Sequence, residues 1–340
     1  MRRCVFVLFL SIYMLCGCSR DYGNQPISAH NFQLDTLVTI TLYDSNDQSI
    51  FQDAFNEMDR LEQILSAVVP ESDLDRLAQN AGKDYIEVSE DTMYLLQQCA
   101  KLSDLSGGAF DCTVGPLVSL WGIKDSAGHY PSGDERKEAL SLIGYQNVLI
   151  RPGNFVMLKK EGMRVNFGAI AKGYIADKVK ELLVSKGVYS AVINLGGDIV
   201  LIGKKPNGSN FKIGVRDPAG GSADYLGVFE LEDKGLVSSG TYERYFIHEG
   251  AAYHHIMNVN TGFPVENELT QVTIVSDSST ECDGFSTAAF ALGLEQGMSL
   301  INNTEGPEAV FVTKDMKIYI TDGIKEKFTI TSDVYEYAAQ

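Results

Sequence analysis

The stretch YHHIMNVNTGFPVENELTQVTIVSDSSTECDGFSTAA (residues 253–289) joins a strand end, a turn, a second strand and a helix. His254 and His255 stand at the end of the first predicted strand, and Asp283 and Thr287 lie in the first turns of the predicted helix. Residues four apart share one helix face, so the oxygens of Asp283 and Thr287 can meet at one point. A base candidate beside such oxygens is typical of metal-assisted phosphate chemistry. A hairpin followed by a packing helix is the structural alternative.

The rest of the chain alternates between strand patterns and amphipathic helix patterns. Residues 37–43 alternate apolar and polar side chains, which predicts a half-buried strand, and residues 50–67 repeat apolar side chains at helical spacing. Ser89 and Ser132 are predicted helix N-caps. Hairpin-like strands dominate and helices are inserted between them, which favours an α+β fold with antiparallel sheets. Further strands are expected over 148–149, 155–158, 190–194, 199–202, 211–215, 225–231, 245–248, 271–276, 309–312, 317–320 and 328–331.

The N-terminus predicts export. Residues 1–17 combine Arg2 and Arg3 with a short apolar run, which is typical of a signal peptide. Gly17 before Cys18 resembles a bacterial lipobox and implies lipidation of the Cys18 thiol, so we expect a protein anchored to a bacterial membrane on its periplasmic or cell-surface side. An ordinary signal peptide is the alternative. Residues 18–30 are interpreted as a tether and 31–335 as one domain.

Charge and cysteine content narrow the function classes. The chain has a net charge of −17, which becomes −19 without residues 1–17, because that segment holds two arginines and no acid. Such a charge argues against nucleic acid as a partner. A site for an anionic substrate must therefore supply its own positive charge, from side chains or from a metal ion. Only Cys99, Cys112 and Cys282 follow Cys18, and three cysteines make no disulfide framework.

Three further segments are candidates for ligand binding. Glycines at 107–108 allow close backbone approach next to Ala109, Phe110 and Asp111, and Phe110 and Trp121 offer flat faces. Lys172 lies in the first turn of a predicted helix, where amide groups favour phosphate. The paired glycines of 194–198 can form an anion nest. Turns with core aromatics and a solvated lysine are the structural alternatives.

The metal candidates favour magnesium over zinc. A carboxylate, a hydroxyl and a backbone carbonyl are hard oxygen ligands, and few protein ligands completed by substrate phosphates suit Mg²⁺. No cysteine–histidine set has zinc spacing, and two adjacent histidines on a strand point to opposite faces. Only one of His254 and His255 can therefore face a site.

Seven segments together resemble the ApbE family of FAD:protein FMN transferases, over residues 34–303. They are SGGAFDCTVGPLVSLWG (106–122), NFGAIAKGYIAD (166–177), INLGGDI (193–199), FKIGVRDP (211–218), SSGTYERYF (238–246), YHHIMNVNTGFP (253–264) and CDGFSTAAFALG (282–293). The resemblance implies a two-lobed, T-fold-related single domain. It also implies Mg²⁺-dependent transfer of FMN from FAD to a Ser or Thr hydroxyl of an acceptor protein, with AMP released.

The resemblance also implies the site residues. The Ala169 carbonyl, Asp283 and Thr287 would bind the metal, Lys172 would reach the phosphates, and His255 would be the base. FAD would contact Leu34, Ala109, Phe110, Asp111, Asn166, Lys172, His255 and Ile256. Leu34, Val68 and Asn166 depart from the residues common in the family. Two alternatives share these residues: an FAD pyrophosphatase that uses water as acceptor, and a non-enzymatic flavin-binding lipoprotein.

Overall fold

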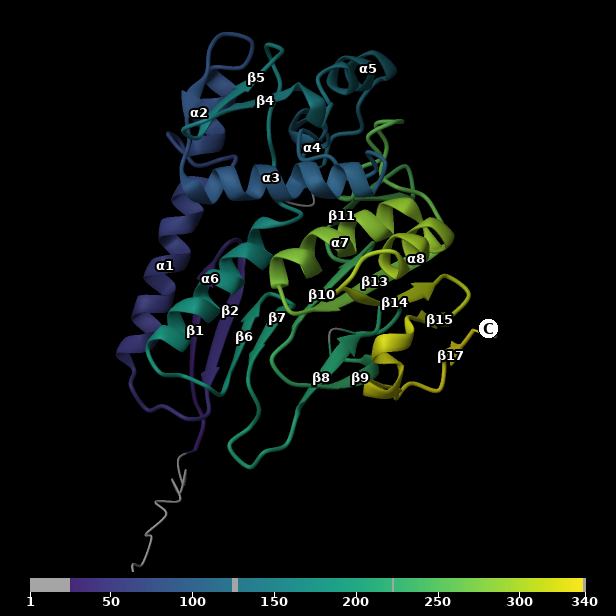
Figure 1. The fold of residues 1–340 in the computed structure, drawn as a ribbon. Helices are drawn as coiled ribbons and strands as arrows, with labels where there is room; N and C mark the ends of the chain where they lie inside the picture. The colour runs from purple at the N-terminus through teal and green to yellow at the C-terminus, as the bar shows by residue number, and fades with distance from the viewer. Residues whose placement is uncertain (1–24, 124–127, 222, 339–340) are drawn as a thin grey trace, which may run out of the picture.

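The central feature of the fold is one open sheet with helices on one face and a small sheet on the other (Figure 1). The computed structural model describes residues 25–123, 128–221 and 223–338. Within those residues the central sheet has nine strands in the order β1-β2-β6-β7-β10-β13-β14-β15-β17. Its neighbouring strands are antiparallel except for β15 and β17. The predicted α+β class with antiparallel sheets is confirmed.

The strand bounds follow the hydrophobic alternation closely in the central sheet. These strands are β1 Ile27–Gln33, β2 Thr36–Leu42, β6 Ala191–Leu195, β7 Asp198–Ile202, β10 Gly235–Gly240, β13 Leu269–Ser276, β14 Glu308–Thr313, β15 Lys317–Ile320 and β17 Glu336–Tyr337. The smaller sheets comprise β3 Ile86–Glu87 with β4 Val148–Arg151 and β5 Phe155–Leu158, β8 Phe211–Arg216 with β9 Tyr225–Leu231 and β16 Phe328–Ile330, and the hairpin β11 Tyr245–His248 with β12 Ala251–His254.

Two helices begin at the caps that the sequence predicts. Ser89 accepts from the Thr92 amide, and Ser132 forms a complete capping box with Glu135. The helices are α1 Ser49–Leu65, α2 Asp73–Gln79, α3 Glu90–Leu105, α4 Gly115–Trp121, α5 Gly133–Ser141, α6 Ala171–Ser185, α7 Ser279–Leu292 and α8 Leu294–Asn302, with short 3₁₀ turns η1 Tyr145–Asn147 and η2 Asp322–Lys327.

Two apolar cores flank the central sheet. One lies between the sheet and α1, α6 and α7, and the other lies between the sheet and the β8–β9–β16 sheet. Ile274 and Val275 in β13 are both buried but enter different cores, because successive side chains of a strand point to opposite faces. The fold therefore buries its middle strands on both sides. Cys99, Cys112 and Cys282 are all buried free thiols.

Strand β1 corrects the predicted tether. It begins at Ile27, inside the segment 18–30, and pairs over its whole length with β2. Its side chains are mostly polar, so no alternation marks it, and cross-strand bonds such as Ser28 Oγ to Thr41 Oγ1 (2.9 Å) stabilise the pair instead. The strand that ends at His254 is confirmed as β12, whereas strand β10 was missed. The sequence of β10, GLVSSG, is rich in residues that disfavour strands.

The signal peptide and Cys18 lie outside the described residues. No helix in the described part of the chain is long and apolar enough to cross a bilayer.

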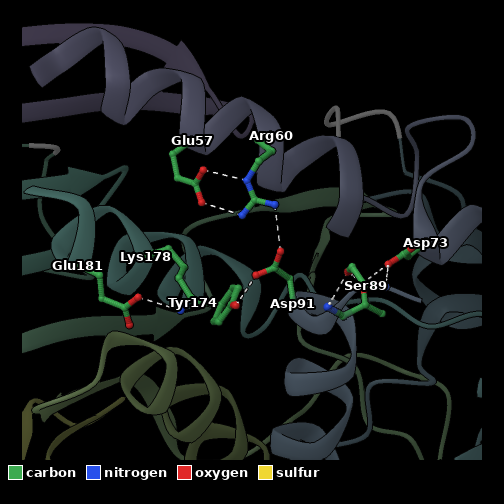
Figure 2. Close-up of polar contacts among 9 residues, drawn as sticks. Glu57, Arg60, Asp73, Ser89, Asp91, Tyr174, Lys178 and Glu181 are labelled. Atoms are coloured by element: carbon green, nitrogen blue, oxygen red, sulfur yellow. Dashed lines mark hydrogen bonds and ion pairs between the residues drawn. The ribbon is translucent and has the colours of Figure 1, made fainter. Parts of the chain in front are cut away.

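A polar network fixes the start of α6 against α1 and α3 (Figure 2). Arg60 of α1 binds Glu57 through two bonds of 2.8 and 2.7 Å and reaches Asp91 of α3 at 3.1 Å. The other oxygen of Asp91 accepts from the Tyr174 hydroxyl of α6 at 2.6 Å. Because Tyr174 follows Lys172 by two residues, this network holds the helix turn that carries Lys172.

Candidate active site

One large cavity, with a volume of about 1130 Å³, collects the predicted site residues. Pockets for small ligands usually measure about 300–1,000 Å³, so this one has room for a dinucleotide. Of the predicted residues, only Cys18 lies outside the described chain. The cavity is lined by Leu34, Ala109, Phe110, Asp111, Asn166, Ala169, Lys172, His255, Ile256, Asp283 and Thr287.

Helices α6 and α7 cross in close contact at Gly173, which decides where Asp283 lies. The Gly173 amide donates to Asp283 Oδ2 at 3.0 Å. A Cβ at position 173 would stand 2.2 Å from the Ser279 carbonyl oxygen, so only glycine fits this crossing. The first turn of α6 thereby meets the first turns of α7.

Asp177, which the sequence interpretation did not single out, holds the same two helices together. Its Oδ2 accepts from the Ser278 hydroxyl (2.8 Å) and from the Thr280 amide and hydroxyl (2.9 and 2.7 Å), and its Oδ1 accepts from the Ser279 amide (2.8 Å). A carboxylate of α6 therefore caps the N-terminus of α7 and also complements its dipole. In the sequence, the only indication of a role for Asp177 was its place at the end of the motif NFGAIAKGYIAD.

Replacing Asp177 with alanine is expected to lower the free energy of unfolding by about 3 kcal/mol, because several charge-assisted bonds are lost at once. Denaturant unfolding measures the change. The matched control is Asp53→Ala, which removes an exposed aspartate that binds Lys186 beyond the other end of α6. That variant should change stability by less than about 1 kcal/mol. Equal effects of the two substitutions would contradict the capping role.

The three oxygen ligand candidates suit a hard cation. Asp283 is buried and Thr287 is half-buried on the same side of α7, while Ala169 precedes α6 by two residues. Burial and the Asp198 charge raise the pKa of Asp283, while Lys172 opposes the shift. Burial disfavours the ionised form of a carboxyl group, so a cation bound beside it stabilises that form. In the described residues no three His, Cys, Asp or Glu side chains form a metal cluster. The candidate donors are therefore one carboxylate and two neutral oxygens, a set that suits Mg²⁺ when substrate phosphates complete its coordination.

Lys172 has a protein partner that the sequence did not predict. Its Nζ lies 2.6 Å from Asp198 Oδ2, and Asp198 is buried at the start of β7. Burial alone lowers the pKa of Lys172, but the charges of Asp198 and Asp283 raise it. The ammonium group is thus held protonated at the cavity wall, which also includes Gly196 and Gly197, whose positive φ angles shape the turn between β6 and β7.

Charged residues that the sequence analysis did not single out also line the cavity, among them Arg216, Glu243 and Arg244. Desolvation raises the pKa of Glu243 to about 7, although Lys172 opposes the shift. The two arginines add positive charge to a cavity in a strongly acidic protein. Their signal lay in the segments FKIGVRDP and SSGTYERYF, which contain them.

The two histidines have different environments. His254 is buried, and its Nε2 lies 2.8 Å from the Val265 carbonyl oxygen. His255 is half-buried and lines the cavity, and its Nδ1 lies 3.3 Å from the Arg244 carbonyl oxygen. A carbonyl only accepts, so Nδ1 of His255 carries the proton and Nε2 keeps its lone pair. Desolvation, together with nearby positive charge, lowers the pKa of His255 to about 4, so the ring is neutral near pH 7.

The loop of residues 106–116 is held by hydrogen bonds of Asp111 that the sequence did not predict. Asp111 accepts from the Thr113 amide (2.8 Å) and hydroxyl (2.6 Å) and from the Tyr145 amide (2.9 Å). Most of its acceptor capacity therefore holds the loop. Trp121 is fully buried and donates to the Gly262 carbonyl at 2.8 Å, and it also belongs to the cavity wall. Phe110 is buried in the cavity wall.

Comparisons with known proteins agree with this geometry. The model of the ApbE family matches residues 34–311. The FAD:protein FMN transferase of Klebsiella pneumoniae (strain 342) is 33% identical, with 92% of this chain and 97% of the relative covered. That of Treponema pallidum (strain Nichols) is 30% identical, with 94% of both covered.

A solved structure shows the same fold. The crystal structure of the ApbE protein from Thermotoga maritima superposes with a TM-score of 0.82 at 31% identity, over 89% of this chain and 99% of that one. The family match covers the cavity-lining residues from Leu34 to Thr287. The chain therefore belongs to the ApbE family.

Proposed function

We propose that this protein transfers FMN from FAD to a Ser or Thr hydroxyl of an acceptor protein and releases AMP. The observation that carries the proposal is the convergence of a neutral histidine, a protonated lysine and a buried carboxylate on one cavity. The names of the relatives, FAD:protein FMN transferase, support the same activity.

His255 acts as the general base. Its Nε2 accepts the proton of the acceptor hydroxyl, because a neutral alcohol is a weak nucleophile. The hydroxyl oxygen then forms a bond to the phosphorus of the FMN half, and the bond from that phosphorus to the bridging oxygen breaks, so the electron pair leaves with AMP. Arg216, Arg244 and Lys172 supply positive charge where negative charge develops on the phosphates.

The Ala169 carbonyl, Asp283 and Thr287 would hold Mg²⁺. The ion would neutralise phosphate charge in the transition state. Its fit rests on the donor set and on the buried carboxyl of Asp283.

The protein acts outside the cytoplasm in this proposal, anchored by lipid on Cys18. Support comes from the apolar run of residues 4–14 and from Gly17-Cys18. Metabolic labelling with a radioactive fatty acid should mark the protein and should fail with Cys18→Ser.

Transfer is tested with purified protein, FAD, Mg²⁺ and a candidate acceptor, followed by in-gel flavin fluorescence. We expect fluorescence on the acceptor that depends on Mg²⁺ and resists denaturation. FMN and AMP formed at the same rate without acceptor would identify an FAD pyrophosphatase instead. Tight retention of FAD with no AMP release would identify a flavin-binding protein.

The effect of Mg²⁺ on stability should depend on pH. The pKa of Asp283 rises from 3.8 to about 7 in the folded protein without metal, so its stabilising contribution is present below about pH 4 and is lost as the pH rises to about 7. Mg²⁺ should therefore raise the unfolding temperature more at about pH 8 than at about pH 5. Thermal scans with and without Mg²⁺ measure this difference, which Asp283→Asn should remove.

A further inference from the structure

A chain of three hydroxyl groups lies beside the proposed cation site. Ser239 Oγ, at the end of β10, is 2.8 Å from Ser286 Oγ and 3.3 Å from Thr287 Oγ1. Ser286 Oγ donates to the Asp283 carbonyl oxygen at 2.8 Å. Ser239 and Ser286 are buried, so bulk water does not compete for the bond between them.

The direction of each bond follows from counting protons. Each hydroxyl has one proton, and a carbonyl oxygen can only accept. The proton of Ser286 is used on the Asp283 carbonyl, so Ser239 must be the donor to Ser286. With its own proton used, Ser239 can only accept from Thr287. The Thr287 proton is therefore directed at Ser239, and the lone pairs of its oxygen stay free.

We propose that Ser239 is a positioning residue that orients the Thr287 hydroxyl as an oxygen ligand for the cation. The inference rests on the proposed Mg²⁺ site. A cation is attracted to the lone pairs of a hydroxyl and repelled by its proton, so a hydroxyl free to rotate is a poorer ligand than one whose proton is already bonded. Partners that orient a ligand in this way typically change metal affinity about 10–100-fold when removed.

Burial within the contact between β10 and α7 makes this arrangement specific. Ser286 is fully buried, and Ser239 is 7% exposed. The neighbouring Ser238 is on the same strand, but its hydroxyl bonds to Thr273 Oγ1 on β13 at 2.8 Å. Strand alternation thus gives two adjacent serines different partners, of which only Ser239 reaches α7.

The test is a titration of the full protein, freed of metal, with Mn²⁺ alone, in which free Mn²⁺ is followed by electron paramagnetic resonance. Ser239→Ala is expected to weaken Mn²⁺ binding about tenfold or more. The matched control, Ser238→Ala, should bind Mn²⁺ as the wild type does. Thermal unfolding of the metal-free variants reports separately any loss of stability.

A double-mutant cycle shows whether Ser239 acts through Thr287. Thr287→Val removes the ligand hydroxyl and should itself weaken Mn²⁺ binding. In that background Ser239→Ala should cause no further loss, because the hydroxyl that it orients is gone. Additive losses would overturn the proposal, because they would mean that Ser239 affects the metal by another route.

Ser286→Ala provides a second variant should Ser239→Ala fail to fold. Without Ser286, the proton of Ser239 is free to turn to Thr287, so the Thr287 proton turns to the cavity and Mn²⁺ binding should weaken. Wild-type affinity in both serine variants would overturn the inference and leave the metal site standing. If the wild-type protein bound no Mn²⁺, the metal site itself would be refuted, and this inference with it.

Discussion

Replacing Asp283 with alanine is expected to reduce Mg²⁺-dependent flavin transfer by at least about a thousandfold. The carboxylate is the only charged group among the three proposed metal ligands. A bound cation contributes several kcal/mol to a phosphoryl transition state, and each 1.36 kcal/mol is a factor of ten in rate. Initial rates of acceptor labelling at saturating FAD, over a series of Mg²⁺ concentrations, measure the loss.

Asp283→Asn separates the charge from the hydrogen bond. Asparagine keeps an oxygen that can accept from the Gly173 amide, so the crossing of α6 and α7 should persist. We expect this variant to fold like the wild type and still lose transfer. Wild-type activity in either variant, at Mg²⁺ levels that only just saturate the wild type, would refute the metal assignment.

The second large effect is expected at His255. Alanine at this position removes the proton acceptor and should slow transfer about 10²–10⁴-fold, the usual contribution of general base catalysis. FAD binding should remain, because the histidine acts on the acceptor hydroxyl. Fluorescence titration with FAD and single-turnover labelling of the acceptor distinguish binding from chemistry.

The adjacent histidine is the matched control. His254 is buried and bonded to the Val265 carbonyl, so His254→Gln, whose side-chain amide can also donate to that carbonyl, should leave transfer within about tenfold of the wild type. If His254→Gln stopped transfer and His255→Ala did not, the assignment of the base would be wrong.

Local sequence patterns were sufficient to predict most of the helices and several of the strands. The capping residues Ser89 and Ser132 lie at helix starts, and Val38 alternates with its neighbours as predicted. Such features depend on residues close in the chain, which is why periodicity and caps report them. Strands β1 and β10 escaped detection because cross-strand partners, rather than their own side chains, stabilise them.

The sequence by itself determined the family resemblance, the α+β class and eleven of the residues that line the cavity, from Leu34 to Thr287. Strand alternation also showed that only one of the two adjacent histidines can face the site and act as the base. These follow from short motifs and from periods of two and 3.6 residues, which belong to the local chain.

Only the tertiary structure decided which groups face each other. Lys172 pairs with Asp198, 26 residues away, and Asp177 caps a helix that begins 102 residues later. Ser239 reaches Thr287 only because β10 packs under α7. The physical reason is that such contacts depend on strand order and on the helix crossing at a glycine, which arise from packing over the whole chain rather than from any local period.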